Sequence, residues 1–188
     1  MRATTIMGML VFAALTRVLP HPPNFAPIAA IALFGAMTFK SAKVALLFPM
    51  AAMLLSDIAI EVAYRSGMSE SWGFHKGMWV IYALMAFIGA LGLAFKDTNP
   101  KFTKIGALSL TSSIMFFVIS NFAVWAGSGM YSRDTVGLTE CYVAAIPFFY
   151  WTVLGDLCYT MTLFSAWAVV QNRIPALRLN QTTRFGTI

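Results

Sequence analysis

The stretch PHPPNFAPIAAIALFGAMTF, residues 20–39, decides the architecture expected for this chain. Its first part carries four prolines. Proline removes a backbone donor and clashes with the preceding turn, so residues 20–27 cannot continue a helix. The second part is apolar and rich in Ala, which predicts a short, closely packed helix over residues 27–39. We therefore expect a stiff, irregular loop between two apolar helices.

The chain around this stretch has the composition of a membrane protein. Its 188 residues are 59% hydrophobic and 11% charged, whereas soluble domains are roughly 25% charged. Long apolar runs close to the ~20 residues that cross a hydrocarbon core are supplemented by two shorter segments. They predict an all-α, polytopic membrane protein, a single integral membrane domain over residues 1–188 with six transmembrane helices at about 3–18, 27–39, 43–64, 78–95, 105–127 and 148–171.

The basic residues predict the orientation of these helices, because cytoplasmic segments carry an excess of Lys and Arg. Six spans with an internal N-terminus place most of the 13 Lys and Arg residues inside, namely Arg2, Lys40, Lys43, Lys96, Lys101, Lys104, Arg173, Arg178 and Arg184. The outside receives Arg17, Arg65, Lys76 and Arg133. We expect both termini to be cytoplasmic, in a multi-pass protein of the bacterial cytoplasmic (inner) membrane. This asymmetry accounts for the net charge of +6 without a nucleic-acid partner.

A cleaved signal peptide is the competing interpretation of the N-terminus. Arg2 followed by an apolar run up to Leu15 has the right shape for one. However, Arg17 and the prolines stand where a small-residue cleavage site should lie. We therefore favour a first helix that stays in the mature chain.

Polar side chains gather in the outer halves of the expected spans. An ionisable group in hydrocarbon costs about 2.5–3.5 kcal/mol, so each needs a structural or functional reason. The inner halves are expected to be almost wholly apolar, unlike a channel, which carries polar lining through its full depth. The pattern predicts a solute-binding pocket open to the outside, lined by Arg17, His21, Asn24, Asp57, Glu61, Asn121, Trp125 and Asp156.

Several of these residues have structural alternatives. Arg17 could pair with Asp57 or Glu61, Asn121 could make a helix-to-helix hydrogen bond, and Trp125 could be an interfacial anchor. The small residues of the helix at 27–39 could serve internal packing or dock a partner helix. The sequence leaves each choice open.

Metal and cofactor chemistry has little support in the sequence. His21 and His75 are expected outside but are isolated, and Cys141 and Cys158 show neither metal-ligand spacing nor a disulfide pattern. We expect no metal, no cofactor and no catalytic residues.

Several motifs together resemble a known group of proteins. These are LPHPPNFAPIAAIALFG, LLSDI, SNFAVW, GLTECYVAAIPFF and GDLCYTMTLF, which span roughly residues 10–170. They resemble an uncharacterised family of bacterial transport-like membrane proteins that is similar to the S components, the substrate-binding subunits of energy-coupling factor vitamin transporters.

The resemblance implies an S-component-like bundle of six helices. Its ligand site would lie on the extracytoplasmic side, formed by the loops after helices one, three and five, and would serve uptake of a vitamin or related micronutrient. In S components the whole subunit topples in the membrane, driven by a transmembrane coupling protein and ATPases. This chain contains no G-x-x-x-x-G-K-[ST] motif, so ATP use would belong to partners. Some relatives are thought to work alone.

Other functions remain as alternatives to capture of a vitamin-like solute. The chain could be a structural or assembly subunit of a larger membrane complex. It could be a carrier that uses Asp57 or Asp156 as a proton site. It could also be a membrane enzyme with Asp57, Glu61 and Asp156 as acid and base groups, although no His or metal site accompanies them at matching depth.

Overall fold

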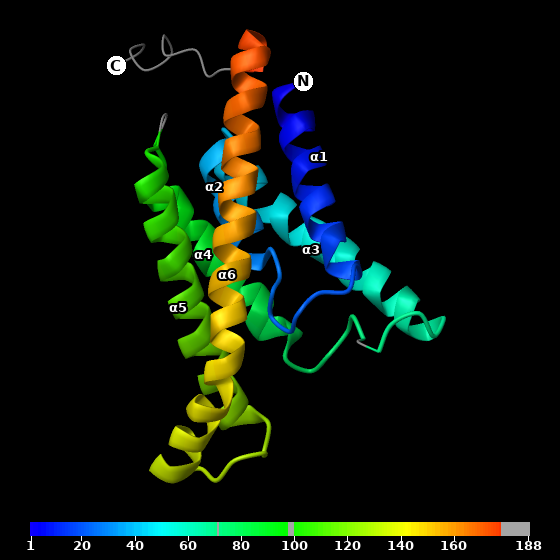
Figure 1. Cartoon of the computed structure of the whole chain (residues 1–188), viewed down its shortest axis with the longest axis vertical. Coiled ribbons are helices and arrows are strands. Elements are labelled where there is room, and N and C mark those ends of the chain that lie inside the picture. Colours follow the sequence, from blue (N-terminus) through cyan, green and yellow to red (C-terminus); the bar gives the residue numbers. More distant parts are fainter. Residues whose placement is uncertain (71, 98–99, 178–188) are drawn as a thin grey trace.

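The computed structural model describes residues 1–70, 72–97 and 100–177. Within these ranges the chain forms six α-helices and no β-strand (Figure 1). They are α1 (Arg2–Leu15), α2 (Ile28–Thr38), α3 (Ala42–Arg65), α4 (Met78–Ala94), α5 (Phe102–Gly127) and α6 (Thr135–Arg173). Short 3-10 helices, η1 (Thr16–Val18) and η2 (Pro175–Leu177), follow α1 and α6. The prediction of an all-α fold is confirmed.

Three of these helices are long and apolar enough to cross a membrane. They are α3, α5 and α6, with 24, 26 and 39 residues. The other three are shorter apolar helices: α1 has 14 residues, α2 has 11 and α4 has 17. The expected span at 78–95 therefore forms α4, which is shorter than each of the three long helices.

The sixth helix begins earlier than the sequence predicted. A start near residue 148 was expected, whereas α6 begins at Thr135 and includes Pro147. Its N-cap is Asp134, whose side chain accepts a hydrogen bond from the backbone of Gly137 at 2.8 Å. Neighbouring helices and local adjustments compensate for proline in membrane helices, so Pro147 does not end the helix. The hairpin of α5 and α6 consequently extends beyond the other helices (Figure 1).

The short helix α2 is the centre of the bundle. It contacts each of the other five α-helices, and every residue from Ala29 to Thr38 is buried. Close packing depends on small residues: a Cβ added to Gly92 of α4 would lie 2.8 Å from that of Ala36. The small-residue surface therefore serves internal packing, which decides between the two alternatives left by the sequence.

Basic side chains hold the C-terminal end of α2. Arg2 donates hydrogen bonds to the carbonyl oxygens of Thr38 and Leu177, and Lys96 donates to that of Phe39. The last carbonyl groups of a helix have no intrahelical partners and carry partial negative charge, so cations there are stabilising. Burial lowers the pKa of Lys96, and the nearby charge of Arg2 lowers this pKa further.

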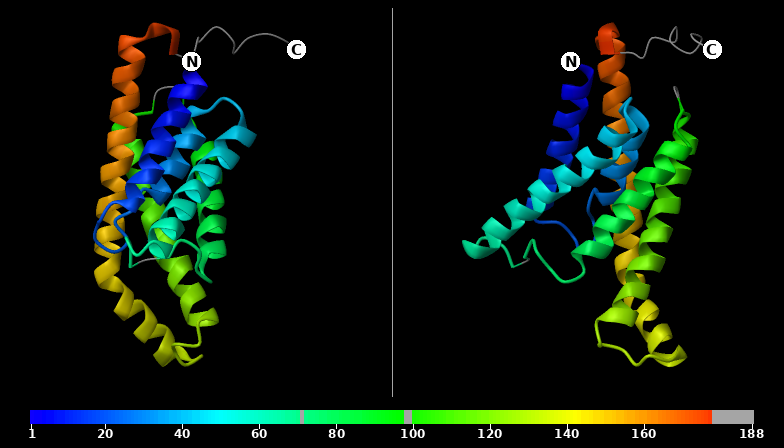
Figure 2. Two further views of the ribbon diagram at one scale, coloured as in Figure 1. Left: turned by 90° about the vertical axis from the view of Figure 1, so that its right-hand side faces the viewer. Right: turned by 180° about the vertical axis from the view of Figure 1, so that it is seen from behind.

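The helices diverge at the end opposite the start of α1. α1 begins and α6 ends at the same end of the molecule, and successive helices alternate in direction (Figure 1). α3 tilts away from α4, α5 and α6 (Figure 2). Two connections lie near this divergence, the proline loop (residues 19–27) and the α3–α4 loop (residues 66–77).

The cap of α6 predicts a pH dependence of the α5–α6 hairpin. Hydrogen bonds from the backbone of Gly137 and from the Ser132 hydroxyl lower the pKa of Asp134 below its ordinary value of 3.8. A lowered folded-state pKa stabilises the hairpin above pH ~4, and this contribution is lost as pH falls through the lowered pKa. Amide hydrogen exchange at the start of α6 should therefore accelerate in acid. Asp134→Asn keeps a capping side chain and should remove this acceleration; if both proteins respond alike, another group is responsible.

Candidate ligand-binding site

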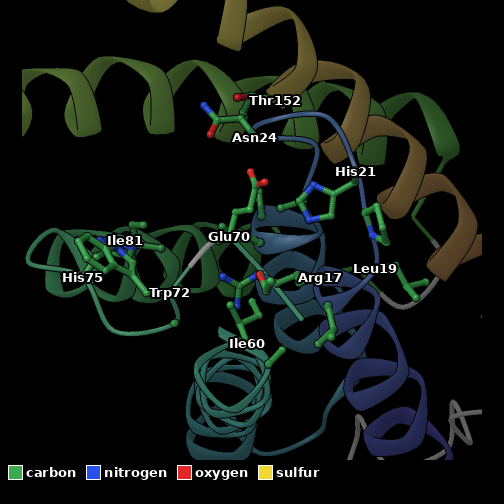
Figure 3. A pocket seen from close by; sticks show the side chains of 18 of the residues that line it. Arg17, Leu19, His21, Asn24, Ile60, Glu70, Trp72, His75, Ile81 and Thr152 are labelled. Carbon is green, nitrogen blue, oxygen red and sulfur yellow. The ribbon is translucent and has the colours of Figure 1, made fainter. Parts of the chain in front are cut away.

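A cavity of about 650 Å³ lies where the helices diverge. Its walls come from η1, the proline loop, the start of α2, the C-terminal part of α3, the α3–α4 loop, one residue each of α4 and α5, and two residues of α6. Arg17, His21, Asn24 and Asp156 line it, together with Glu70, Trp72, His75 and Thr152 (Figure 3). Four of the eight predicted site residues are thus brought together.

Arg17 forms one wall of the cavity and is held from behind by α3. Its Nη1 atom lies 2.6 Å from Asp57 Oδ1 and 2.6 Å from the Ser56 hydroxyl. The Tyr82 hydroxyl donates to the other oxygen of Asp57 at 2.7 Å. Asp57 does not line the cavity; its side chain is 5% exposed, against 16% for Arg17. Asp57 therefore orients Arg17.

Glu61 has a different role from Asp57, although it lies one turn further along α3. Its carboxylate pairs with Arg65 at 2.7 Å and accepts a hydrogen bond from the backbone N–H of Gly73 at 3.2 Å. A Cβ added to Gly73 would lie 1.9 Å from the carbonyl oxygen of Asp57. Only glycine fits there, so the α3–α4 loop docks directly on the backbone of α3. Glu61 fastens this loop and does not line the cavity.

Asp156 lies in the wall that α6 contributes, near the N-terminus of α2. It is 3% exposed and accepts a hydrogen bond from the Ser113 hydroxyl of α5 at 2.7 Å. The backbone N–H of Ala29 also bonds to it. The first N–H groups of a helix lack intrahelical partners and carry partial positive charge. Asp156 thus caps, from another helix, the buried helix at the centre of the fold.

The proline loop reaches this wall because of its turn and because of a glycine in α6. Asn24 has a φ of 65°, a conformation that Asn tolerates better than most residues. Phe25 packs against Tyr159 of α6 with ring centroids 5.7 Å apart. A Cβ added to Gly155 would lie 3.0 Å from the backbone nitrogen of Ala26, so Gly155 permits the close approach. The loop is held in place, with His21 and Asn24 beside the cavity.

A layer of hydroxyl groups lies beneath Asp156, which corrects the expectation of almost wholly apolar inner halves. Ser109 of α5 and Thr160 of α6 are 3.2 Å apart. Both are buried, as are Ser112 and Ser113. Ser112 and Ser113 donate to carbonyl oxygens one turn back in α5. Such bonds satisfy the serine hydroxyls inside a helix bundle. The apolar residues around these serines keep the mean hydropathy of the segment high, so hydropathy did not reveal this layer.

Asn121 and Trp125 were predicted as site residues but lie away from the cavity, in the α5–α6 hairpin. The Asn121 amide donates to the carbonyl oxygen of Phe117 in its own helix at 2.8 Å. Trp125 Nε1 donates to that of Ser132 at 2.9 Å. Neither lines the cavity, and neither does the turn after α5, residues 128–134. The extension of the hairpin carries them beyond the other helices.

The sequence analysis missed the contribution of the α3–α4 loop. Glu70 and Trp72 come from this loop, and the tryptophan ring packs edge-on against Tyr64 of α3 at 6.1 Å. The run SESWGFHKG carries acidic, aromatic and imidazole groups around a glycine, shortly after α3 ends at Arg65. That combination of residues in the sequence could have indicated a loop that contributes to a binding site. Among the described residues, no group of three His, Cys, Asp or Glu could hold a metal ion.

The chain belongs to a family of unknown function (DUF6580), which matches residues 1–177. No curated protein and no solved structure matches the chain significantly. The family description assigns no activity, so the resemblance to S components stays a prediction.

Proposed function

We propose that this family member captures a small, polar, vitamin-like solute from the extracytoplasmic side of the bacterial cytoplasmic membrane. The cavity between the proline loop, the α3–α4 loop, α3 and α6 carries the proposal. Its volume of about 650 Å³ falls in the range of roughly 300–1,000 Å³ typical of small-molecule sites. Its lining mixes charged, imidazole, amide and aromatic groups, which suits a ring compound bearing polar substituents.

The proposed orientation has six membrane crossings with both termini in the cytoplasm. Lys96 and Arg2 lie at the end of the bundle where α1 begins, and the connection between α2 and α3 brings Lys40 and Lys43 to the same end. Cytoplasmic ends are enriched in such residues. The cavity lies toward the opposite end and would therefore open outward. The helices α1, α2 and α4 would cross only together with their flanking residues or in a locally thinned bilayer.

The position of α2 supports capture rather than a continuous channel. Asp156 in the cavity wall bonds to the first turn of α2, and every residue of this helix from Ala29 onward is buried. A channel requires polar lining through its full depth. Release to the cytoplasm would therefore need a larger movement. We propose, from the resemblance to S components, that a transmembrane coupling protein and ATPases drive that movement, the alternative being a solitary transporter.

The preorganised loops support tight binding by a capture subunit. The proline loop is held by Phe25 against α6, and the α3–α4 loop by Gly73 against α3. Fixing a loop before binding reduces the entropy lost when the ligand arrives.

Binding is testable with a matched pair of tryptophan variants. Purified wild-type protein should show a raised thermal unfolding temperature with one class among vitamins, their precursors and nucleobases. A ligand at 100 times its Kd stabilises by about 2.7 kcal/mol. Trp72→Ala should weaken binding about tenfold because base–aromatic stacking contributes roughly 1–3 kcal/mol. Trp79 is also exposed, at 74% against 59% for Trp72, but does not line the cavity, so Trp79→Ala should bind as wild type does.

Two results would contradict the proposal. Equal weakening by both tryptophan variants would place the solute elsewhere. If no compound shifts unfolding and mass spectrometry finds no retained small molecule, a structural or assembly subunit becomes the better proposal. Co-purification with a larger membrane complex in fixed stoichiometry would then support it.

A further inference from the structure

We infer that the captured solute is an organic cation, a ring compound bearing an amine or quaternary ammonium group. This inference rests on the proposed capture function and adds the charge of its substrate. It follows from the balance of charges around the cavity and from the partner that each charged group has.

Two carboxylates line the cavity, and neither has a basic partner among the described residues. They are Glu70 and Asp156. The guanidinium of Arg17 is the basic group of the described lining, and Asp57 behind it balances its charge at 2.6 Å. His21 and His75 complete the titratable groups of the described lining. With neutral histidines and both carboxyl groups ionised the cavity is net negative, and an added cation would restore neutrality.

Asp156 supplies a buried carboxyl group at the α6 wall, and a cationic ligand group beside it would stabilise its charged form. Its contacts, the Ser113 hydroxyl and the Ala29 N–H, are both neutral donors. The N-terminus of α2 offsets only about half an elementary charge. A buried charge without a full counter-charge is costly, so a cationic ligand group beside Asp156 would gain more than a neutral one.

Glu70 supplies the second negative charge, from the α3–α4 loop. Within the described part of the chain its carboxylate makes no hydrogen bond or ion pair. In the view of Figure 3 it lies between Arg17 on one side and Asn24 and Thr152 on the other, beside the ring of His21. A cation in the cavity would therefore meet one carboxylate from the loop and one from α6.

The remaining lining suits the apolar body of such a cation. Ile60, Ile81, Trp72 and Phe116 come from four different elements and give the cavity aromatic and aliphatic surface. An ammonium group over an aromatic face gains roughly 0.5–2 kcal/mol. An anionic solute, in contrast, would find one guanidinium that is already paired and two carboxylates that repel it.

Probes that share one ring system and differ in the charge of the side chain test the inference. The indole set is tryptamine (cation), N-acetyltryptamine (neutral) and indole-3-propionate (anion), and equivalent sets carry pyridine and pyrimidine rings. Each is added to the purified full-length protein in detergent, and the unfolding temperature and Kd are measured. We expect binding in the cationic arm, at least about tenfold tighter than in the neutral arm, as for a close charge pair.

Charge-neutralising variants show which carboxyl groups contribute to binding of the cation. Glu70→Gln should weaken binding of the cation about threefold, since Glu70 is exposed and screened. Asp156→Asn should weaken it about tenfold or more. Asp156 also caps α2, so Asp156→Asn changes the fold as well as the charge. Glu70 has no such role, so Glu70→Gln tests the charge independently of folding. Glu140 of α6 is exposed and lies outside the cavity, so Glu140→Gln removes the same charge and should leave binding unchanged.

The outcomes separate this inference from the function on which it rests. Binding confined to the anionic or neutral arms would overturn the cation assignment and leave solute capture standing. Equal weakening by Glu70→Gln and Glu140→Gln would also overturn it, because the effect would be one of general surface charge. No binding in any arm, with none of the vitamins or nucleobases bound either, would count against solute capture and the inference together.

Discussion

Asp57→Ala is expected to lower the free energy of unfolding by about 3 kcal/mol or more, the typical cost of breaking a buried ion pair by removing one partner. The substitution leaves the guanidinium of Arg17 without its counter-charge in a site where its side chain is 16% exposed. It also removes the acceptor of the Tyr82 hydroxyl. Thermal or denaturant unfolding of the purified protein in detergent measures the loss. Solute binding should weaken as well, because Arg17 is no longer held against α3.

Glu61→Ala is the matched control for this substitution. Glu61 lies one turn away on the same helix, but its partner Arg65 is 76% exposed, and exposed ion pairs contribute little. The unfolding temperature should change much less than with Asp57→Ala. If both variants lose stability equally, the loss comes from removing a carboxylate from this part of α3 and not from breaking the buried ion pair. If Asp57→Ala is as stable as wild type, the pairing with Arg17 does not stabilise the fold.

Gly73→Ala is expected to detach the α3–α4 loop from α3 and to destabilise the protein by about 2–3 kcal/mol, at the upper end of the usual overpacking cost. The added Cβ would stand 1.9 Å from the carbonyl oxygen of Asp57 and 2.9 Å from the backbone nitrogen of Glu61. Both are backbone atoms of a helix, so no rotamer change can relieve the clash. Glu70 and Trp72 would leave the cavity together with the loop.

Hydrogen exchange and limited proteolysis of residues 66–77 would detect this detachment, and solute affinity should fall with it. Gly127→Ala is the control, because an added Cβ there has no neighbour within 4 Å. That variant should resemble wild type in exchange, stability and binding. Unchanged protection of the loop in Gly73→Ala would contradict the docked arrangement.

The partners of the carboxylates favour capture over acid–base catalysis. Asp57 is paired with Arg17, Glu61 with Arg65, and Asp156 accepts from Ser113. Only Asp156 among these three lines the cavity. General acid–base chemistry needs titratable groups within reach of one substrate, and here two of the three acids organise the walls.

Much of the architecture was predictable because it depends on local sequence. The prolines of residues 20–27 break the chain wherever they lie, and long apolar runs form helices whatever their neighbours. The structure confirms the all-helical fold, and the helix positions agree closely except at the start of α6. There, the helix begins at Thr135, is capped by Asp134 and continues through Pro147.

The sequence by itself determined that this is an apolar, all-helical chain with a proline-rich break between its first two helices. It could not determine which groups meet. Arg17 selects Asp57 over Glu61. Gly73 lets the α3–α4 loop dock on α3, and Gly155 of α6 lets the proline loop, distant in sequence, approach that helix. Asn121 and Trp125 are carried away by the extended hairpin. The depth of a residue in the bundle follows from its position along its helix. Which residues contact one another depends on helix rotation, tilt and loop docking, and only the packing of the whole bundle sets these.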